Sequence, residues 1–199
     1  MAAGPFRASP RGFTVVEVLL ATAIAVIVMA VSVPLTIDAT DRIRTGMAAR
    51  YLATRIMDAR MQSIRRSTRV ALRFEPVEKD YGFAEYLDGN GDGVRTADIA
   101  ARIDPELAPR QLLGDQFPQV AFGLMPGIPD INGSRSLAHS DGVRIGTSRI
   151  LTLGPDGTAT SGTLYLHGRR AQYAVRILGA TGRTRVMQFD QGARQWVAR

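Results

Sequence analysis

Residues 88–99, which read DGNGDGVRTADI, carry oxygen-bearing side chains at alternating positions. This spacing is typical of the first half of a calcium loop, in which oxygens at positions 1, 3 and 5 are followed by a glycine at position 6. The candidate calcium ligands are Asp88, Asn90, Asp92, the carbonyl group of Val94, Thr96 and Asp98. Position 12 is Ile99 rather than a bidentate acid, so we expect any calcium binding to be weak or to use another geometry. The alternative, which the pattern slightly favours, is a plain turn rich in Asp, Asn and Gly.

A second candidate site is the pair Arg183 and Arg185, which alternate in the apolar–polar pattern of residues 183–189. Alternate residues of a strand face one way, so both side chains could contact phosphate groups. The whole chain has a net charge of +7, and arginine supplies every basic residue except Lys79. Because the charge is modest and spread along the chain, we favour a solvated strand face over a nucleic-acid site.

The residues offer little for catalysis. The chain has no cysteine, which excludes a disulfide framework, a thiol nucleophile and a Cys-ligated zinc site. No sequence pattern places a serine and an acid with either histidine, His139 or His167. The stretch GPDGTATSG lacks the Gly-Lys-Ser/Thr ending of a phosphate-binding loop. We therefore expect a protein that is not an enzyme and has no cofactor other than a candidate calcium ion.

The amino-terminal region has the pattern of a membrane anchor. Residues 18–37 contain no charge, and about 20 such residues are enough to span a bilayer as a helix. Arg7 and Arg11 precede this stretch, so the positive-inside rule places the amino terminus in the cytoplasm. Glu17 stands at the start of the apolar stretch. A carboxylate is costly to bring into lipid, so an acid at this position suggests a specific function.

The run Gly12-Phe13-Thr14-Val15-Val16-Glu17 resembles the processing site of type IV prepilins and type II secretion pseudopilins. The resemblance implies that prepilin peptidase removes a leader of residues 1–12 and methylates the new amino terminus at Phe13. Residues 13–37 would then form the membrane-spanning helix. The resemblance also implies that Glu17 pairs with the amino terminus of a neighbouring subunit in the filament. Pro34 stands where many pilins kink, and a proline inside a helix removes one hydrogen bond and crowds the preceding turn.

After the apolar stretch, the periodicity predicts first a helix and then a β-rich domain. Residues 38–66 continue the helix as an amphipathic segment with two apolar faces. One face carries Ile43, Met47, Tyr51, Met57, Met61 and Ile64, and the opposite face carries Ala48, Leu52, Ile56 and Ala59. A helix with two apolar faces is packed on two sides. Residues 67–199 alternate in short runs, which predicts an antiparallel, sandwich-like domain and an α+β fold overall.

The carboxy-terminal half resembles the GspH/FimT family of minor pseudopilins and minor pilins, through ILTLGPDGTATSGTLYL (150–166) and QYAVRILGATGRTRV (172–186). Leu153 stands where the family has Phe. Some DNA-uptake members carry Gly-Arg-x-Arg-x-Arg near the end, and here Met187 replaces the third arginine.

The resemblance implies a minor pseudopilin of a type II secretion system. Such a protein is held in the inner membrane by one helix, with its domain in the periplasm, and its partners are prepilin peptidase and other pseudopilins or pilins. The alternative is a DNA-binding minor pilin of a type IV pilus, although the charge makes nucleic acid an unlikely partner.

Overall fold

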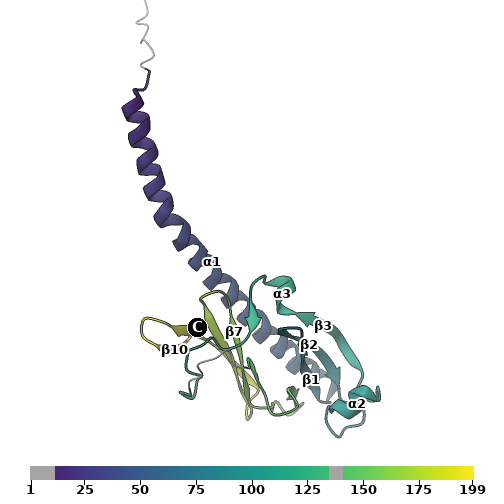
Figure 1. The fold of residues 1–199 in the computed structure, drawn as a ribbon. Coiled ribbons are helices and arrows are strands. Elements are labelled where there is room, and N and C mark those ends of the chain that lie inside the picture. The colour runs from purple at the N-terminus through teal and green to yellow at the C-terminus, as the bar shows by residue number, and fades with distance from the viewer. Residues whose placement is uncertain (1–11, 135–140) are drawn as a thin grey trace, which may run out of the picture. The chain divides into compact units, whose positions relative to one another are not determined.

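The computed structural model describes residues 12–134 and 141–199 (Figure 1). The chain divides into two units, one that ends at Ala39 and one that runs from Thr40 to Arg199. We describe each unit by itself. The expected leader lies outside the described residues except for Gly12, and so does His139.

The longest element is helix α1, Val15–Arg66, which joins the two segments expected at residues 13–37 and 38–66. Judged by length and composition, its amino-terminal part is able to cross a bilayer, and no other helix in the described residues passes that test. This confirms the expectation of one helix near the amino terminus that is fit to span a membrane. The helix runs through Pro34 without a break in its secondary structure.

Helix α1 ends at Arg66 in a Schellman motif. The amide of Thr68 donates to the carbonyl group of Ser63, and the amide of Ser67 donates to that of Ile64, both at 3.2 Å. Ser67 takes the left-handed conformation that this motif requires, with φ of 51°. The turn ends the helix at Arg66, so that β1 can begin four residues later.

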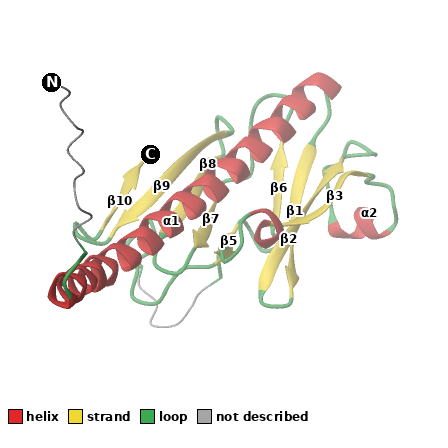
Figure 2. Ribbon diagram, turned by 90° about the horizontal axis from the view of Figure 1, so that it is seen from above, coloured by secondary structure: helices red, strands yellow, loops and turns green. Residues whose placement is uncertain are grey.

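Two antiparallel sheets follow (Figure 2). The four-stranded sheet has the order β3-β2-β1-β6, with β1 Val70–Val77, β2 Asp80–Leu87, β3 Glu106–Leu112 and β6 Ile150–Leu153. The six-stranded sheet has the order β10-β9-β8-β7-β4, and β5 also pairs with β7. Its strands are β4 Ala121–Phe122, β5 Val143–Arg144, β7 Gly162–His167, β8 Gln172–Leu178, β9 Arg183–Asp190 and β10 Gln195–Ala198. The short helices are α2 Thr96–Ala100 and α3 Leu113–Gln116.

The core of the second unit lies between α1 and both sheets, as Figure 2 shows for the part of α1 that crosses them. The helix contributes the face with small residues, namely Ala48, Ala49, Leu52, Ile56 and Ala59. The four-stranded sheet contributes Leu72, Phe74, Phe83 and Leu151, and the six-stranded sheet contributes Leu164, Leu166, Val175 and Ile177. The antiparallel sheets and the α+β class are as expected. The core, however, lies between the helix and the two sheets, and the helix contributes mostly small side chains to it.

The outer face of each sheet is covered by a connecting segment. Val94 and Ile99, from the region of α2, pack on Ala71, Tyr86 and Ile150 of the four-stranded sheet. Leu124 and Ile128 pack on one end of the six-stranded sheet, beside Tyr165, Phe189 and Trp196. The other end of that outer face is not part of this apolar cluster.

A buried carboxylate fixes α1 to the β7–β8 turn. Asp41, which is 6% exposed, accepts hydrogen bonds at 2.9 Å from the backbone amides of Arg169, Arg170 and Ala171. Gly168 makes room for this contact, since a Cβ there would lie 2.2 Å from an Asp41 oxygen. Burial raises the pKa of Asp41, but the three amide hydrogen bonds outweigh burial and hold the pKa below its usual value.

We predict that Asp41→Asn lowers the free energy of unfolding by about 1–3 kcal/mol at neutral pH, because a buried charged acceptor is lost. A lowered folded-state pKa stabilises the fold fully above the ordinary aspartate pKa of about 3.9, and this stabilisation disappears as pH falls through the folded-state value. The gap between wild type and variant should therefore close in acid. Thermal unfolding of the full chain in a non-ionic detergent, at a series of pH values, measures this difference in stability. The control is Asp115→Asn, at an exposed carboxylate, and a gap that stays constant into acid would contradict the assignment.

Candidate functional site

The expected processing site lies at the start of the described residues. Gly12 has no atom within 4 Å of the place where a Cβ would stand, and Phe13 is exposed. The peptide bond between them therefore precedes the helix and is open to another protein. This is the placement that a cleavage site needs, because a peptidase binds its substrate in an extended form.

Glu17 and Thr14 form a capping box at the amino terminus of α1. The Glu17 carboxylate accepts hydrogen bonds from the Thr14 amide at 2.8 Å and the Thr14 hydroxyl group at 2.9 Å. The Glu17 amide donates to the Thr14 hydroxyl oxygen at 3.2 Å. These contacts satisfy donors that a helix leaves unpaired at its first turn. Glu17 thus has a local role that we did not infer from the sequence, although the Thr-x-x-Glu spacing was the signal for it.

Past Thr40, α1 has the two apolar faces that its sequence predicts. In the single chain only one of them is packed, and the other is exposed. The face of Ala48, Leu52, Ile56 and Ala59 is buried in the core. On the opposite face Ile43, Met47, Met57, Met61 and Ile64 are exposed, and Tyr51 is half-buried beside Phe117. We call these five exposed residues the apolar stripe. The stripe is a surface that the domain itself does not cover.

The loop at residues 88–98 is closed by its own backbone amides. Asp88 is 5% exposed, and its carboxylate accepts from the amides of Gly91 at 2.7 Å and Gly93 at 2.9 Å. Asp104, which is also buried, accepts from the amides of Gly89 and Arg95, each at 3.0 Å. These contacts hold the loop in a compact turn through its own backbone amides.

The other candidate calcium ligands do not converge on Asp88. Asp92 forms an ion pair with Arg95 at 2.8 Å, and the Asn90 side chain accepts from the Asp92 amide. Thr96 and Asp98 lie in α2. Within residues 12–134 and 141–199, no three His, Cys, Asp or Glu side chains are grouped as a metal site would need.

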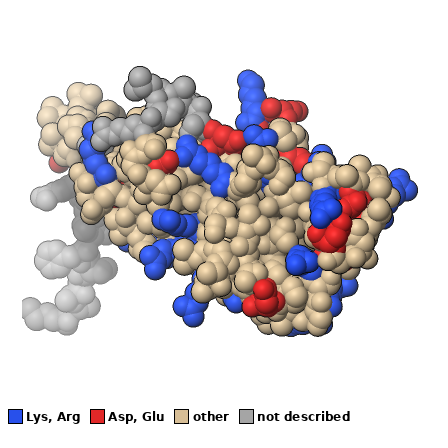
Figure 3. Space-filling view, turned by 90° about the horizontal axis from the view of Figure 1, so that it is seen from below, with Lys and Arg blue, Asp and Glu red and all other residues tan. Residues whose placement is uncertain are grey.

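Arg183 and Arg185 lie on β9 and are both exposed. In the described residues no hydrogen bond or ion pair joins either of them to a carboxylate. The residue opposite Arg185 on β8 is Arg176, and the residue opposite Arg183 is Leu178. Figure 3 shows basic side chains scattered over an otherwise largely uncharged face, some beside acidic ones and some alone. Arg176 was not among the residues that we selected from the sequence, because its position depends on strand register.

Comparison of the chain with family models, with curated proteins and with solved structures finds no match.

We predict that Asp88→Ala destabilises the domain by about 1–3 kcal/mol whether calcium or a chelator is present, because two buried amides lose their acceptor. Asp92→Ala should cost less than about 1 kcal/mol, since its ion pair with Arg95 is exposed. Melting temperatures in millimolar calcium and in chelator test this. If calcium raised the melting temperature of the wild type and neither variant responded, the loop would be a calcium site.

Proposed function

We propose that this chain is a minor pseudopilin of a type II secretion system and acts as a structural subunit, not as an enzyme. Prepilin peptidase cuts it between Gly12 and Phe13 and methylates Phe13. The apolar part of α1 then holds it in the inner membrane with the domain in the periplasm, until it joins other pseudopilins in the filament. The support from the sequence is the Gly-Phe-x-x-x-Glu run followed by an uncharged stretch of membrane-spanning length.

The observation that carries the proposal is the apolar stripe of α1. Five large apolar side chains stay exposed on a helix whose opposite face is buried in the core. Burying one such side chain contributes about 1.5–3 kcal/mol, so covering the stripe with the helices of other subunits would stabilise a filament substantially. Three of the five are methionines, whose unbranched and flexible side chains adapt to neighbours of different shape.

Glu17 supports the proposal in a second way. In the single chain its carboxylate is already held by Thr14, so the acid has a partner before assembly. In the filament, the amino group that cleavage creates at Phe13 of a neighbouring subunit would offer a positively charged partner. A charge pair in an apolar bundle is strongly attractive, and an unpaired charge there is penalised. Glu17 would thus favour one register between neighbouring helices.

A DNA-binding minor pilin of a type IV pilus is the second candidate. Arg183 and Arg185 are exposed and have no carboxylate partner in the described residues, which favours contact with an anion. Two arginines on one strand are few for a nucleic-acid site, and removal of the two leader arginines lowers the net charge from +7 to +5. We therefore place this candidate second.

We predict that Gly12→Val leaves the leader attached, because a side chain at this position blocks entry of the extended chain into the peptidase. Mass spectrometry of the membrane-extracted protein should find a methylated amino terminus at Phe13 in the wild type and Met1 or Ala2 in the variant. An uncut wild type in cells with active prepilin peptidase would contradict the whole proposal.

We also predict that Met57→Glu and Met61→Glu leave the melting temperature within about 2 °C of wild type, because neither residue is part of the core. Each should reduce co-purification with the other filament subunits about tenfold, since a charge replaces buried apolar area in the interface. The control is Ile103→Glu, which changes an exposed apolar residue away from α1. If all three variants lost co-purification equally, the apolar stripe would not be the assembly surface.

A further inference from the structure

The outer face of the six-stranded sheet carries a row of residues in direct cross-strand register. Arg144 on β5 is opposite Thr163 on β7, Thr163 is opposite Arg176 on β8, and Arg176 is opposite Arg185 on β9. Their chain neighbours Leu164, Val175, Ile177 and Val186 pack toward α1. Since strand side chains alternate between faces, the row points away from α1. We call these four residues the arginine row.

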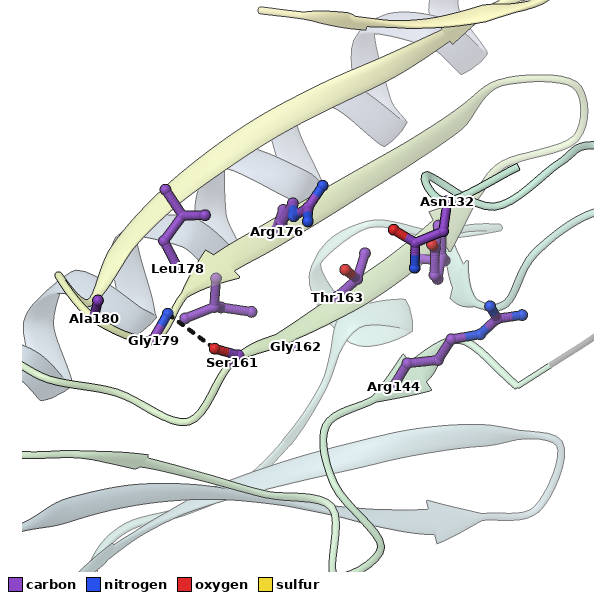
Figure 4. A pocket seen from close by; sticks show the side chains of 11 residues that line it. Asn132, Arg144, Ser161, Gly162, Thr163, Arg176, Leu178, Gly179 and Ala180 are labelled. Carbon is purple, nitrogen blue, oxygen red and sulfur yellow. Dashed lines mark hydrogen bonds between the residues drawn. The ribbon is translucent and has the colours of Figure 1, made fainter. Parts of the chain in front are cut away.

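A hollow of about 490 Å³ is lined by three residues of the arginine row, Arg144, Thr163 and Arg176. Arg185 is opposite Arg176 on the next strand and is not part of the lining. Figure 4 shows Arg176 and Thr163 on neighbouring strands, with Asn132 and Arg144 toward one end and Leu178 and Ala180 toward the other. The Ser161 hydroxyl oxygen accepts from the Gly179 amide at 3.1 Å, so the hydroxyl proton of Ser161 can be donated to a ligand. The hollow therefore presents hydroxyl, amide and guanidinium donors beside the exposed aliphatic side chain of Leu178.

The charges of the row are only partly compensated within the chain. Arg144 forms an ion pair with buried Asp130 at 2.6 Å, and its guanidinium lies 5.2 Å from the centre of the Tyr165 ring. All 18 Asp and Glu residues of the chain lie in the described residues, and none forms an ion pair or hydrogen bond with Arg176 or Arg185. Like charges directly opposite on neighbouring strands destabilise a sheet. The fold thus keeps two arginines directly opposite each other, and one of them, Arg176, lines the donor-rich hollow.

We propose that this hollow binds an acidic peptide segment of a partner protein, with carboxylates held between Arg176 and Arg185. A guanidinium group binds a carboxylate through two parallel hydrogen bonds, and the ligand would relieve the repulsion between the two arginines. Thr163 and Ser161 donate further hydrogen bonds, and Leu178 contacts the aliphatic part of the segment. This surface faces away from α1, so the proposal does not depend on the role of the apolar stripe in assembly.

The lining of the hollow favours a peptide over a nucleic acid. Proteins that bind single strands stack the bases on exposed aromatic rings. The one aromatic residue that lines the hollow, Tyr165, is 1% exposed, and Arg144 lies over its ring. A duplex needs a long series of phosphate contacts to bind tightly at physiological salt. The hollow of about 490 Å³ is too small for such a series of contacts. Its size suits a short peptide segment that carries two or three carboxylates.

The test uses the full chain in a non-ionic detergent and a fluorescent eight-residue peptide of alternating Glu and Leu. The wild type should bind this peptide and should not bind the same peptide with Gln in place of Glu. Arg176→Gln and Arg185→Gln should each raise Kd about tenfold, because each removes a charge-assisted contact. The control is Arg65→Gln, which removes an equal charge from the exposed end of α1 and should change Kd less than about twofold.

Melting temperatures separate loss of binding from loss of folding. Without peptide, Arg176→Gln should melt at the same temperature as the wild type or higher, since the substitution removes a repulsion. Equal peptide affinity in the wild type and both row variants would overturn the proposal. So would tighter binding of a 20-nucleotide single strand or duplex in 0.15 M salt, if the same variants abolished it. Met57→Glu should bind the peptide normally, which distinguishes this site from the assembly surface.

Discussion

The close packing of α1 on both sheets is the contact on which the rest of the domain depends. Ala48, Ala49 and Ala59 have no exposed surface and give the sheets a flat, narrow surface to pack on. Gly46 continues this surface, since a Cβ there would lie 3.0 Å from the Tyr173 hydroxyl oxygen. A larger side chain in such a layer costs about 1–3 kcal/mol through displacement of its neighbours. Because the same face of α1 packs against both sheets, a larger side chain on this face would disturb the packing of both sheets.

One face of α1 is buried against the sheets and the opposite face is exposed, and the two faces differ in composition. The side that meets the sheets has small residues, and the opposite side has isoleucines and methionines that nothing in the domain covers. A helix in a soluble domain would carry charged or polar residues on that side. The stability of the domain therefore does not explain the large exposed side chains, whereas the proposed packing against other subunits would. Asp41 has the complementary role, because its bonds to the β7–β8 turn hold the helix so that the stripe stays outward.

Periodicity predicted the elements that are long or strictly alternating. The two faces of residues 43–64 follow from a period of 3.6 residues, and the antiparallel strands after residue 67, β9 among them, follow from a period of 2. Helices α2 and α3 are too short to show a period, and β3 contains Pro109 and charged residues that conceal its alternation. The contact of Asp41 with Ala171 joins residues 130 positions apart, so no local pattern reveals it. The arginine row depends on the register of four strands, which the sequence alone does not specify.

The domain buries four aspartates whose carboxylates accept hydrogen bonds from backbone amides. Asp41, Asp88 and Asp104 each accept hydrogen bonds from two or three backbone amides, and Asp130 accepts from two amides besides Arg144. These acids hold turns in place. Two of them also pair with an arginine, Asp130 with Arg144 and Asp88 with Arg69. The excess positive charge must then lie where side chains are exposed, and strand register places part of it in one row on the six-stranded sheet. Like charges directly opposite on neighbouring strands lower the stability of a sheet unless a counter-charge covers them, and this is the physical basis of the binding site that we propose there.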